Sequence, residues 1–390
     1  MTPIPFLIVG GGIGGLATAL GLARRGYWVT VLEREPRFTE IGAGLQLAPN
    51  AMRVLDKFGL SSKIGQLAWF PKRLVLNDIA TATELTALNL GPEFRARYGF
   101  PYVVMHRGDL LEVLYQACLE TGRVTLLSHQ TVEAIEDGDE EVRVLCQDGA
   151  EYRARAVVAA DGLWSRSRAL LSDDVPMVAD YVAYRGTLPT KEVAGDTHMD
   201  DVVMWIGENQ HFVQYPVRRG ELYNQVAVFK VPPFTSNPDK SDLDEAFRSA
   251  CQPVRQAIGF MDKSRTWPMM DRGPIPRWAR GRVALLGDAA HPMLQYIAQG
   301  ACQAIEDAGY LASLAGQMGH DPVEMFLAYQ TARVPRTARV QEAARDFGAI
   351  IHSGDPGAIL LRDYVFKMPT STIYEAVLDW LYGYNAVADW

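Results

Sequence analysis

The chain has little cysteine and no long uninterrupted hydrophobic run. Cys118, Cys146, Cys251 and Cys302 lie far apart and form no C-x-x-C pair, so neither a zinc site nor a disulfide framework is indicated. The most apolar early stretch, Ile4 to Leu22, is interrupted by six glycines and has no basic segment before it, which argues against a signal peptide. Arginines follow before a membrane span could reach the roughly 20 residues that a bilayer needs. We expect a soluble protein of the reducing cytoplasm.

Positive charge is also in deficit. The chain has 38 Lys and Arg against 46 Asp and Glu, a net charge of -8, which is the wrong sign for a protein that binds nucleic acid or anionic lipid. No Ser-His-Asp order, carboxylate pair or H-E-x-x-H appears in a usable context, so hydrolases have no support. The 390 residues exceed what one hydrophobic core usually serves, and we expect two domains.

The strongest motif lies in the first forty residues. Phe6 to Val9 predicts a strand buried on both faces, and Gly10-x-Gly12-x-Gly14-Gly15 follows at once in the G-x-G-x-x-G spacing. A helical apolar pattern and a second strand come next, and that strand ends at Glu33. Such glycines let a pyrophosphate approach a helix N-terminus, and the acid can accept a hydrogen bond from a ribose hydroxyl. The pattern favours a dinucleotide site over a simple glycine turn, but it leaves NAD and FAD open.

Two later segments favour FAD. Ala156 to Ala159 predicts a strand that runs into Asp161-Gly162, and Arg282 to Leu286 predicts another that runs into Gly287-Asp288, with a helix beginning at Gly300. A nicotinamide dehydrogenase completes its site within one continuous domain, whereas these strand ends are spread along the chain. The Gly300 helix could direct its positive end at an anionic flavin edge. Asp288 could hold ribityl hydroxyls or simply cap a turn.

With these motifs the chain resembles a known family, the single-component FAD-dependent aromatic hydroxylases of the para-hydroxybenzoate hydroxylase fold. The resemblance covers nearly the whole chain and is carried by the G-x-G-x-x-G turn, His106-Arg107-Gly108-Asp109-Leu110, Asp161-Gly162-x-x-Ser165-x-x-Arg168 and Gly287-Asp288-Ala289-Ala290-His291-Pro292. Within the family it most resembles the 3-hydroxybenzoate 6-hydroxylases, through Gly42-Ala43-Gly44-Leu45-Gln46, Ala183 to Thr187, His211 to Pro216, Asn224 to Phe229 and Leu294-Gln295-Tyr296. Salicylate and 6-hydroxynicotinate hydroxylases are similar but more distant. The 6-hydroxynicotinate hydroxylases resemble one another in having a histidine at the position of Gln46. This chain departs from that pattern.

The resemblance implies a fold, a cofactor and a set of cofactor contacts. The fold would be α/β, with a Rossmann-like FAD-binding domain, an inserted and mainly antiparallel substrate domain, and a helical C-terminal region. FAD would be held without a covalent link, with NADH, or less favoured NADPH, as co-substrate. The residues implied for FAD are Gly10, Gly12, Gly14, Gly15, Glu33 and Arg34 at the adenosine half, Arg107, Asp161 and Gly162 near the phosphates or flavin, Asp288 at the ribityl chain, and Gln46, Pro292, Gly300 and Ala301 nearer the ring.

The middle of the chain predicts the substrate domain. Tyr181 to Leu188, Val202 to Ile206, His211 to Tyr215 and Asn224 to Phe229 alternate as strands of an antiparallel sheet, and Leu74 to Leu76 and Glu84 to Leu90 could add two more. Ser241 to Ile258 predicts one helix after the sheet. The expected segments are 1–73, 101–178 and 267–345 for the FAD-binding domain, 74–100 and 179–266 for the substrate domain, and 346–390 for the C-terminal region.

Two titratable rings on one strand suggest the chemistry. Reduced flavin and molecular oxygen give a C4a-hydroperoxide, which attacks an electron-rich ring, and a phenolate is more reactive than a phenol. His211 is the first choice for the base, with Tyr215 beside it, although both could simply pack on one strand face. By resemblance Gln295 would orient the substrate hydroxyl. Gln225 and Tyr296 would contact the ring, and Arg185 the carboxylate.

The sequence therefore predicts a monooxygenase that converts 3-hydroxybenzoate to gentisate. The alternatives are a salicylate or 6-hydroxynicotinate hydroxylase, or a flavin-binding oxidase or redox sensor that uses the same fold. The C-terminal segment, from Tyr364 to Trp390, is rich in aromatic residues. It would cover the FAD-binding domain or form a dimer surface, and we favour a homodimer.

Overall fold

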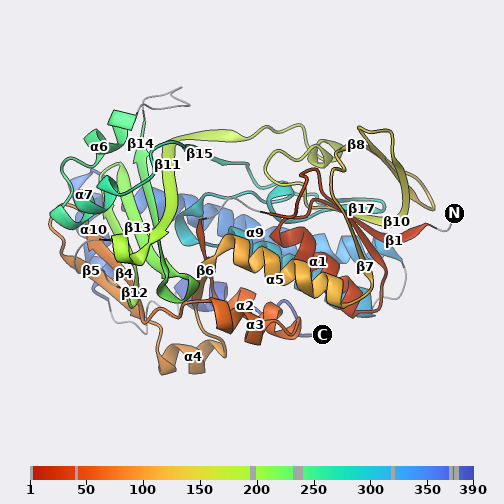
Figure 1. Ribbon diagram of the computed structural model, residues 1–390, viewed down its shortest axis with the longest axis horizontal. Helices are drawn as coiled ribbons and strands as arrows, with labels where there is room; N and C mark the ends of the chain where they lie inside the picture. The colour runs from red at the N-terminus through yellow and green to blue at the C-terminus, as the bar shows by residue number, and fades with distance from the viewer. Residues whose placement is uncertain are drawn as a thin grey trace.

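Two sheets lie side by side along the long axis of the molecule, as Figure 1 shows. The computed structural model describes residues 3–39, 43–193, 199–231, 240–317, 321–368, 372 and 377–390. Gly42 of the predicted flavin segment and Tyr374 of the aromatic tail lie outside these residues.

The first sheet brings the three predicted cofactor motifs together. Its strand order is β16-β17-β10-β1-β2-β7, and β17, β10, β1, β2 and β7 run parallel. Because the carboxyl ends of adjacent parallel strands share one edge, the turns after β1, β10 and β17 meet there. These strands are β1 (Ile4–Val9), β2 (Val29–Leu32), β7 (Val124–Leu127), β10 (Glu151–Ala159), β16 (Ala279–Arg280) and β17 (Val283–Leu285). The first half of β10 also pairs with β9 (Val142–Cys146), which pairs with β8 (Val132–Asp137).

Helices cover this sheet. The glycine turn opens α1 (Ile13–Arg24), which packs against α5 (Arg107–Glu120) and α8 (Gly300–Gln317). Gly21 permits a close approach to α8, because a Cβ there would lie 2.9 Å from the Ala312 Cβ. The remaining helices of this region are α2 (Pro49–Lys57), α3 (Ser61–Leu67), α4 (Pro92–Tyr98) and the long α9 (Pro322–Ile351).

The second sheet confirms the predicted substrate-domain strands. Its order is β15-β11-β14-β13-β12-β4-β5, antiparallel except where β12 and β4 run parallel. The strands are β4 (Arg73–Asp78), β5 (Glu84–Asn89), β11 (Met177–Pro189), β12 (Asp201–Gly207), β13 (Gln210–Val217), β14 (Leu222–Lys230) and β15 (Trp267–Asp271). A two-stranded sheet of β3 (Gly44–Leu47) and β6 (Val103–His106) lies at the junction, where β6 contacts β13.

The two faces of this second sheet have different neighbours. One packs under α6 (Lys240–Ala246) and α7 (Gln252–Gly259), where Phe212 and Phe229 contact Phe247. The single helix predicted over 241–258 is therefore wrong, because the chain turns before Gln252 and α7 restarts with a proline in its first turn. The other face carries Ala183, Ile206 and Val228, which pack against Tyr296 and Ile351 of the cofactor side.

Two predicted segment boundaries differ from the structure. β15 pairs with β11 and so belongs to the substrate-domain sheet, although 267–345 was assigned to the FAD-binding domain. The helix α9 crosses the boundary expected at 345 without a break. Neither position carries a local signal, because strand partners and helix ends depend on the packed fold.

The sequence left two roles open for the C-terminal segment, covering the FAD-binding domain or forming a dimer surface, and the structure supports the first. Leu381 and Tyr382 of α12 (Asp379–Tyr382) are buried in the core of the FAD-binding domain, and the Tyr382 ring contacts those of Phe94, Tyr98 and Tyr102. Residues 377–390 therefore cover that domain. By contrast, α10 (Pro356–Phe366) leaves several apolar side chains exposed, so a dimer stays a prediction.

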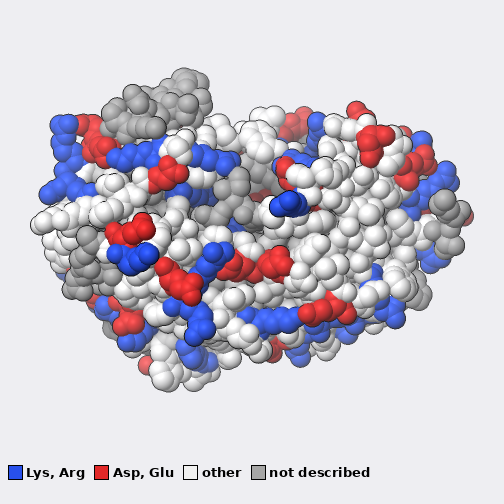
Figure 2. Space-filling view, in the orientation of Figure 1, with Lys and Arg blue, Asp and Glu red and all other residues white. Residues whose placement is uncertain are grey.

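The surface carries both signs of charge. On the face in Figure 2, Lys and Arg are interspersed with Asp and Glu. Within the described ranges, no helix combines the length and the apolar character needed to cross a membrane.

Candidate active site

The turn between β1 and α1 has no room for side chains. Gly10 has a φ of +103°, and a Cβ there would lie 2.3 Å from the Ala160 carbonyl oxygen. A Cβ on Gly15 would lie 1.9 Å from the Gly10 carbonyl oxygen, and one on Gly14 would lie 2.9 Å from Leu286. Gly12 caps α1 without a side-chain hydrogen bond. The turn therefore joins the three strand ends closely, and the first N–H groups of α1 face outward with no intrahelical acceptor.

Glu33 lies at the end of β2, beside this turn. Its Oε2 accepts a hydrogen bond from the Gly11 N–H at 2.6 Å, and its Oε1 accepts one from the Glu35 N–H at 2.8 Å. The carboxylate is thus fixed next to the glycine turn, where the spacing predicted it. Arg34 is exposed and lies 3.5 Å from a Glu35 carboxylate oxygen.

Asp161 organises the loop that follows β10. Its Oδ1 accepts a hydrogen bond from Ser165 Oγ at 2.6 Å, and its Oδ2 accepts one from Ser167 Oγ at 3.0 Å. Gly162 takes a φ of +80°, which favours glycine. The fully buried Arg168 donates to the carbonyl oxygens of Ala289 and Ala290 at 3.1 and 2.6 Å. Arg168 therefore connects this loop to the turn after β17.

Arg107 begins α5 at the base of the site. Burial lowers the pKa of Arg107, and the nearby Asp288 carboxylate acts in the opposite direction. Asp288 itself is exposed in the turn after β17, and its Oδ1 lies 4.0 Å from the place of a Cβ on Gly300. Ala301 follows in α8, while Pro292 is buried and its carbonyl oxygen accepts from Gln341. The predicted flavin contacts after β17 thus gather near the start of α8.

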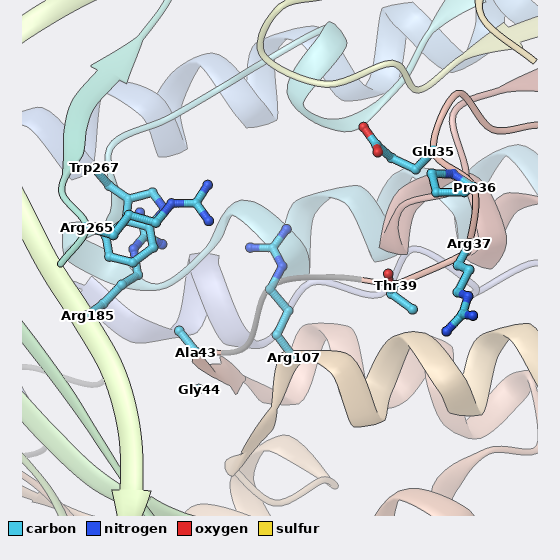
Figure 3. Close-up of a pocket in the computed structure, with 10 residues that line it drawn as sticks. All are labelled: Glu35, Pro36, Arg37, Thr39, Ala43, Gly44, Arg107, Arg185, Arg265 and Trp267. Atoms are coloured by element: carbon cyan, nitrogen blue, oxygen red, sulfur yellow. The ribbon is translucent and has the colours of Figure 1, made fainter. Parts of the chain in front are cut away.

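A cavity of about 610 Å³ lies between the glycine-turn side and the second sheet (Figure 3). Glu35 is the one acidic side chain of its described lining, against four arginines, and the lining consists of Glu35, Pro36, Arg37, Thr39, Ala43, Gly44, Arg107, Arg185, Arg265 and Trp267. Arg185 and Arg265 lie over the Trp267 ring at 5.0 and 5.2 Å from its centroid. This cavity is the local positive site that an anionic ligand needs in a chain of net negative charge.

Arg185 is poised for an anion. Burial and the neighbouring Arg107 lower the pKa of Arg185 to about 10. Its Nε is buried and has no hydrogen-bond partner among the residues that the structure describes. A buried donor of this kind is stabilised when a ligand supplies an acceptor.

Tyr215 faces the same junction as Arg185. Burial raises the pKa of Tyr215, while a hydrogen bond with Gln46 and the charge of Arg185 oppose that rise. Gln46 in turn accepts a hydrogen bond from the Tyr102 hydroxyl at 2.5 Å. Gln46 therefore connects β3 to the substrate-domain sheet through Tyr215, and to the residue before β6 through Tyr102.

Gln225 does not share a face with Tyr215, contrary to the prediction that the two lie together. Tyr215 pairs with Asn224, so Gln225 points to the opposite face, where it pairs with Gln214. Its amide is buried, and neither its oxygen nor its nitrogen has a hydrogen-bond partner within the described part of the chain. Asn224 takes the predicted place: its Oδ1 accepts from the Gly44 N–H at 2.6 Å, and its Nδ2 has no partner.

His211 lies on the same strand face as Tyr215 and is buried, but it is not part of the described lining of the cavity. Its Nδ1 lies 2.7 Å from His352 Nε2, and both rings lie edge-on to Tyr296. Burial and His352 lower the pKa of His211 well below its usual value. Gln295 is half-buried in the turn just before Tyr296. His211 and Tyr296 are thus in contact, and Tyr215 lies next to Gln46.

Sequence reasoning did not find Asn224, Arg265, Trp267 or His352. Trp267 stands near Met269 and Met270 in the sequence, and an aromatic residue in such surroundings usually packs in a core. Asn224 depends on the register of a strand, and His352 follows a helix whose end no motif marks. Asn224 lies within the predicted strand Asn224 to Phe229, where neighbouring side chains point to opposite faces. That alternation was the signal available for separating Asn224 from Gln225.

The fold and this site together define a flavin-dependent oxidoreductase. A family model described as FAD binding domain matches residues 4–344. The chain is 37% identical over 386 residues to 3-hydroxybenzoate 6-hydroxylase from Polaromonas naphthalenivorans, covering 98% of this chain and 96% of that protein. It is 38% identical over 393 residues to 3-hydroxybenzoate 6-hydroxylase 1 from Aquipseudomonas alcaligenes, covering 98% of each.

A solved structure agrees with these relatives. Klebsiella pneumoniae HpxO complexed with FAD and uric acid superposes with a TM-score of 0.86 at 25% identity, over 96% of each chain. The chain belongs to the FAD-dependent aromatic hydroxylases of the para-hydroxybenzoate hydroxylase fold, and FAD is its cofactor.

Proposed function

We propose that this protein hydroxylates 3-hydroxybenzoate to gentisate in the cytoplasm, with NADH as the hydride donor and molecular oxygen as the second substrate. The observation that carries the proposal is the arginine-lined cavity at the junction between the cofactor loops and the substrate-domain sheet. A small aromatic acid needs such a place, with a cation for its carboxylate and polar groups for its hydroxyl. The likeness to two 3-hydroxybenzoate 6-hydroxylases over nearly the whole chain supports the choice of substrate.

The residues present fit FAD. The glycine turn is a cradle that any Cβ would fill, and it opens onto the N-terminus of α1. We assign Gly10, Gly12, Gly14, Gly15, Glu33 and Arg34 to the adenosine half, and Arg107, Asp161 and Gly162 to the phosphates or the flavin. Asp288, Pro292, Gly300, Ala301 and Gln46 would lie along the ribityl chain and the ring. When bound, FAD takes a hydride from NADH and transfers one atom of oxygen to the substrate, while the other leaves as water.

The protein's own groups would bind and activate the aromatic acid. Arg185 would pair with the carboxylate, which satisfies its buried Nε. Gln295 and Tyr215 would orient the hydroxyl, and Tyr296 would contact the ring. His211 would accept the hydroxyl proton, so that the more reactive phenolate meets the oxygen donor.

A substrate panel tests the proposal. Purified holoenzyme is given NADH or NADPH with 3-hydroxybenzoate, salicylate, 4-hydroxybenzoate or 6-hydroxynicotinate, and NADH consumption and product identity are measured together. We expect 3-hydroxybenzoate to accelerate NADH oxidation and to yield gentisate. Salicylate or 6-hydroxynicotinate conversion would assign the protein to those reactions instead. The absence of any aromatic stimulation would favour an oxidase or a redox sensor.

Replacing His211 tests its role as base. We expect His211→Ala to lower the rate of hydroxylation by about 100-fold, the low end of general base contributions, while FAD binding changes little. Activity is followed by product formation, and FAD binding by flavin fluorescence. An equal loss of both would show that His211 serves packing alone.

A further inference from the structure

The two histidines of the substrate side form one buried pair. His211 is 1% exposed and His352 is 6% exposed. The Nδ1 of His211 lies 2.7 Å from Nε2 of His352, and the ring centroids are 5.0 Å apart. His352 comes from the cofactor side, directly after the last residue of α9. The pair therefore joins the substrate-domain sheet to the end of the longest described helix.

The neighbours fix the position of His352. The Tyr181 ring stacks on it at 4.6 Å, and the Tyr296 ring meets it edge-on at 5.3 Å. Its carbonyl oxygen accepts a hydrogen bond from the Asn209 N–H at 3.1 Å. Glu208 lies on the adjoining hairpin, and its side chain lies against Gly354. His352 is thus held by groups from β11, β13, the hairpin before β13 and the turn before α8.

The pair has a defined chemistry. A hydrogen bond between two imidazoles needs one N–H donor and one unprotonated acceptor, so at least one ring is neutral. Burial lowers the pKa of His352 to about 4, and burial together with His352 lowers that of His211, so both are neutral near pH 7. Because Nδ1 of His211 is occupied by His352, Nε2 is the ring nitrogen that remains for the substrate.

His352 lies at the C-terminal end of α9. It follows a helix of 30 residues, whose C-terminal carbonyl groups carry partial negative charge. An imidazolium next to a helix C-terminus is stabilised by that charge. The residues after it, from Gly354 to Gly357, are exposed, so solvent is close.

We propose that His352 is the positioning residue of His211 and passes the substrate's proton towards solvent. The substrate hydroxyl gives its proton to Nε2 of His211, while the Nδ1 proton of His211 moves to Nε2 of His352. His352 then releases its Nδ1 proton to water, which leaves both rings neutral with their protons on the other nitrogens. The starting tautomers return when Nε2 of His211 gives its proton back to the phenolate oxygen of the bound product, Nε2 of His352 returns its proton to Nδ1 of His211, and Nδ1 of His352 takes a proton from water. This inference rests on the proposed function, since it assigns a partner to the proposed base.

The test uses the holoenzyme with His352→Gln and His352→Ala. Glutamine can hold the hydrogen bond to His211 but cannot carry a proton, whereas alanine removes the contact. We expect both to keep FAD and the KM for the aromatic acid within about threefold, and to lower kcat at pH 7 by at least about tenfold. The loss should shrink towards pH 9, because hydroxide then removes the phenolic proton. Added imidazole should restore part of the His352→Ala activity.

His129→Gln is the matched control, since His129 is exposed on the FAD-binding domain. It should leave kcat and its pH profile unchanged. An unaltered kcat and pH profile in His352→Gln would overturn the inference, as would an equal loss at every pH without imidazole rescue. Failure of the proposed function itself would look different, because the wild-type enzyme would then yield no gentisate from 3-hydroxybenzoate.

Discussion

At the scale of single residues, the glycine turn offers the sharpest test of the cofactor site. Gly10→Ala would force a Cβ against the Ala160 carbonyl at a φ of +103°. We expect the variant to lose FAD and to be destabilised by about 2–3 kcal/mol, because the backbone must shift. FAD content is measured by absorbance, and stability by urea unfolding.

Gly26→Ala provides the control for that change. Gly26 also has a positive φ, of +91°, but a Cβ there would meet no atom within 4 Å. It should cost only about 1 kcal/mol and retain FAD. If both variants keep FAD equally, the close approach at Gly10 does not shape the cofactor site.

The same residues show what a sequence can predict. Gly10, Gly15 and Glu33 could be assigned from spacing, because turn geometry and strand ends are local properties. Gln225 was misplaced and Asn224 overlooked because strand parity reverses with a single step of register. His352 was missed because its contact with His211 joins residues 141 apart in the sequence.

At the scale of elements, α8 and α9 are joined by a buried network of charges. Arg333 Nε donates to Asp307 Oδ1 at 2.7 Å, and His291 Nε2 lies 2.6 Å from Asp307 Oδ2. Burial alone would raise the pKa of Asp307, but His291 and Arg333 outweigh it and hold the pKa at about 2. Asp307 of α8 thus holds the turn after β17 through His291 and holds α9 through Arg333. The role of His291 here is structural.

Asp307→Asn should therefore destabilise the protein in a pH-dependent way. Removing one member of a buried ion pair costs about 3–5 kcal/mol. Because folding lowers the pKa of Asp307, its contribution is complete above the unfolded value near 3.8 and is lost as the pH falls towards about 2. Urea unfolding of both proteins should show a constant gap from pH 7 to about 5, narrowing below about 4. A gap that does not change with pH would mean that the lost contacts are not ionic.

At this scale the sequence predicted strands better than helices. The alternating pattern of β11 to β14 survives in the structure because one face of each strand is buried against helices and the other against the cofactor side. The region from 241 to 258 has helical composition, yet a turn divides it, and apolar periodicity continues across such a break. The sheet membership of β15 depends on a partner strand about eighty residues earlier and has no local cause.

At the scale of the whole molecule, the domains are joined by contacts that no single segment contains. Arg336 of α9 donates to the carbonyl oxygens of Trp380 and Leu381 at 2.8 and 2.9 Å, which fastens the C-terminal residues to the FAD-binding domain. These C-terminal residues therefore pack within their own chain. Internal packing thus explains much of the aromatic composition that suggested a dimer, and α10 is one apolar surface of the described residues that stays exposed.

Among the described residues, α10 offers one surface on which to test the homodimer prediction. Leu360, Leu361 and Tyr364 are 74%, 63% and 66% exposed, an apolar cluster that isolated soluble chains seldom display. In a twofold dimer the same cluster meets itself, so one added charge appears twice in the interface. We expect Leu361→Glu to convert a dimer to a monomer in sedimentation velocity at micromolar concentration, with hydroxylation retained. Val175→Glu, which changes an apolar residue 72% exposed outside α10, should leave the sedimentation coefficient unchanged. If wild type and Leu361→Glu sediment alike, whether as monomers or as dimers, α10 is not the dimer contact. An interface through α10 would bury two carboxylates that face each other, and the association would not survive that cost.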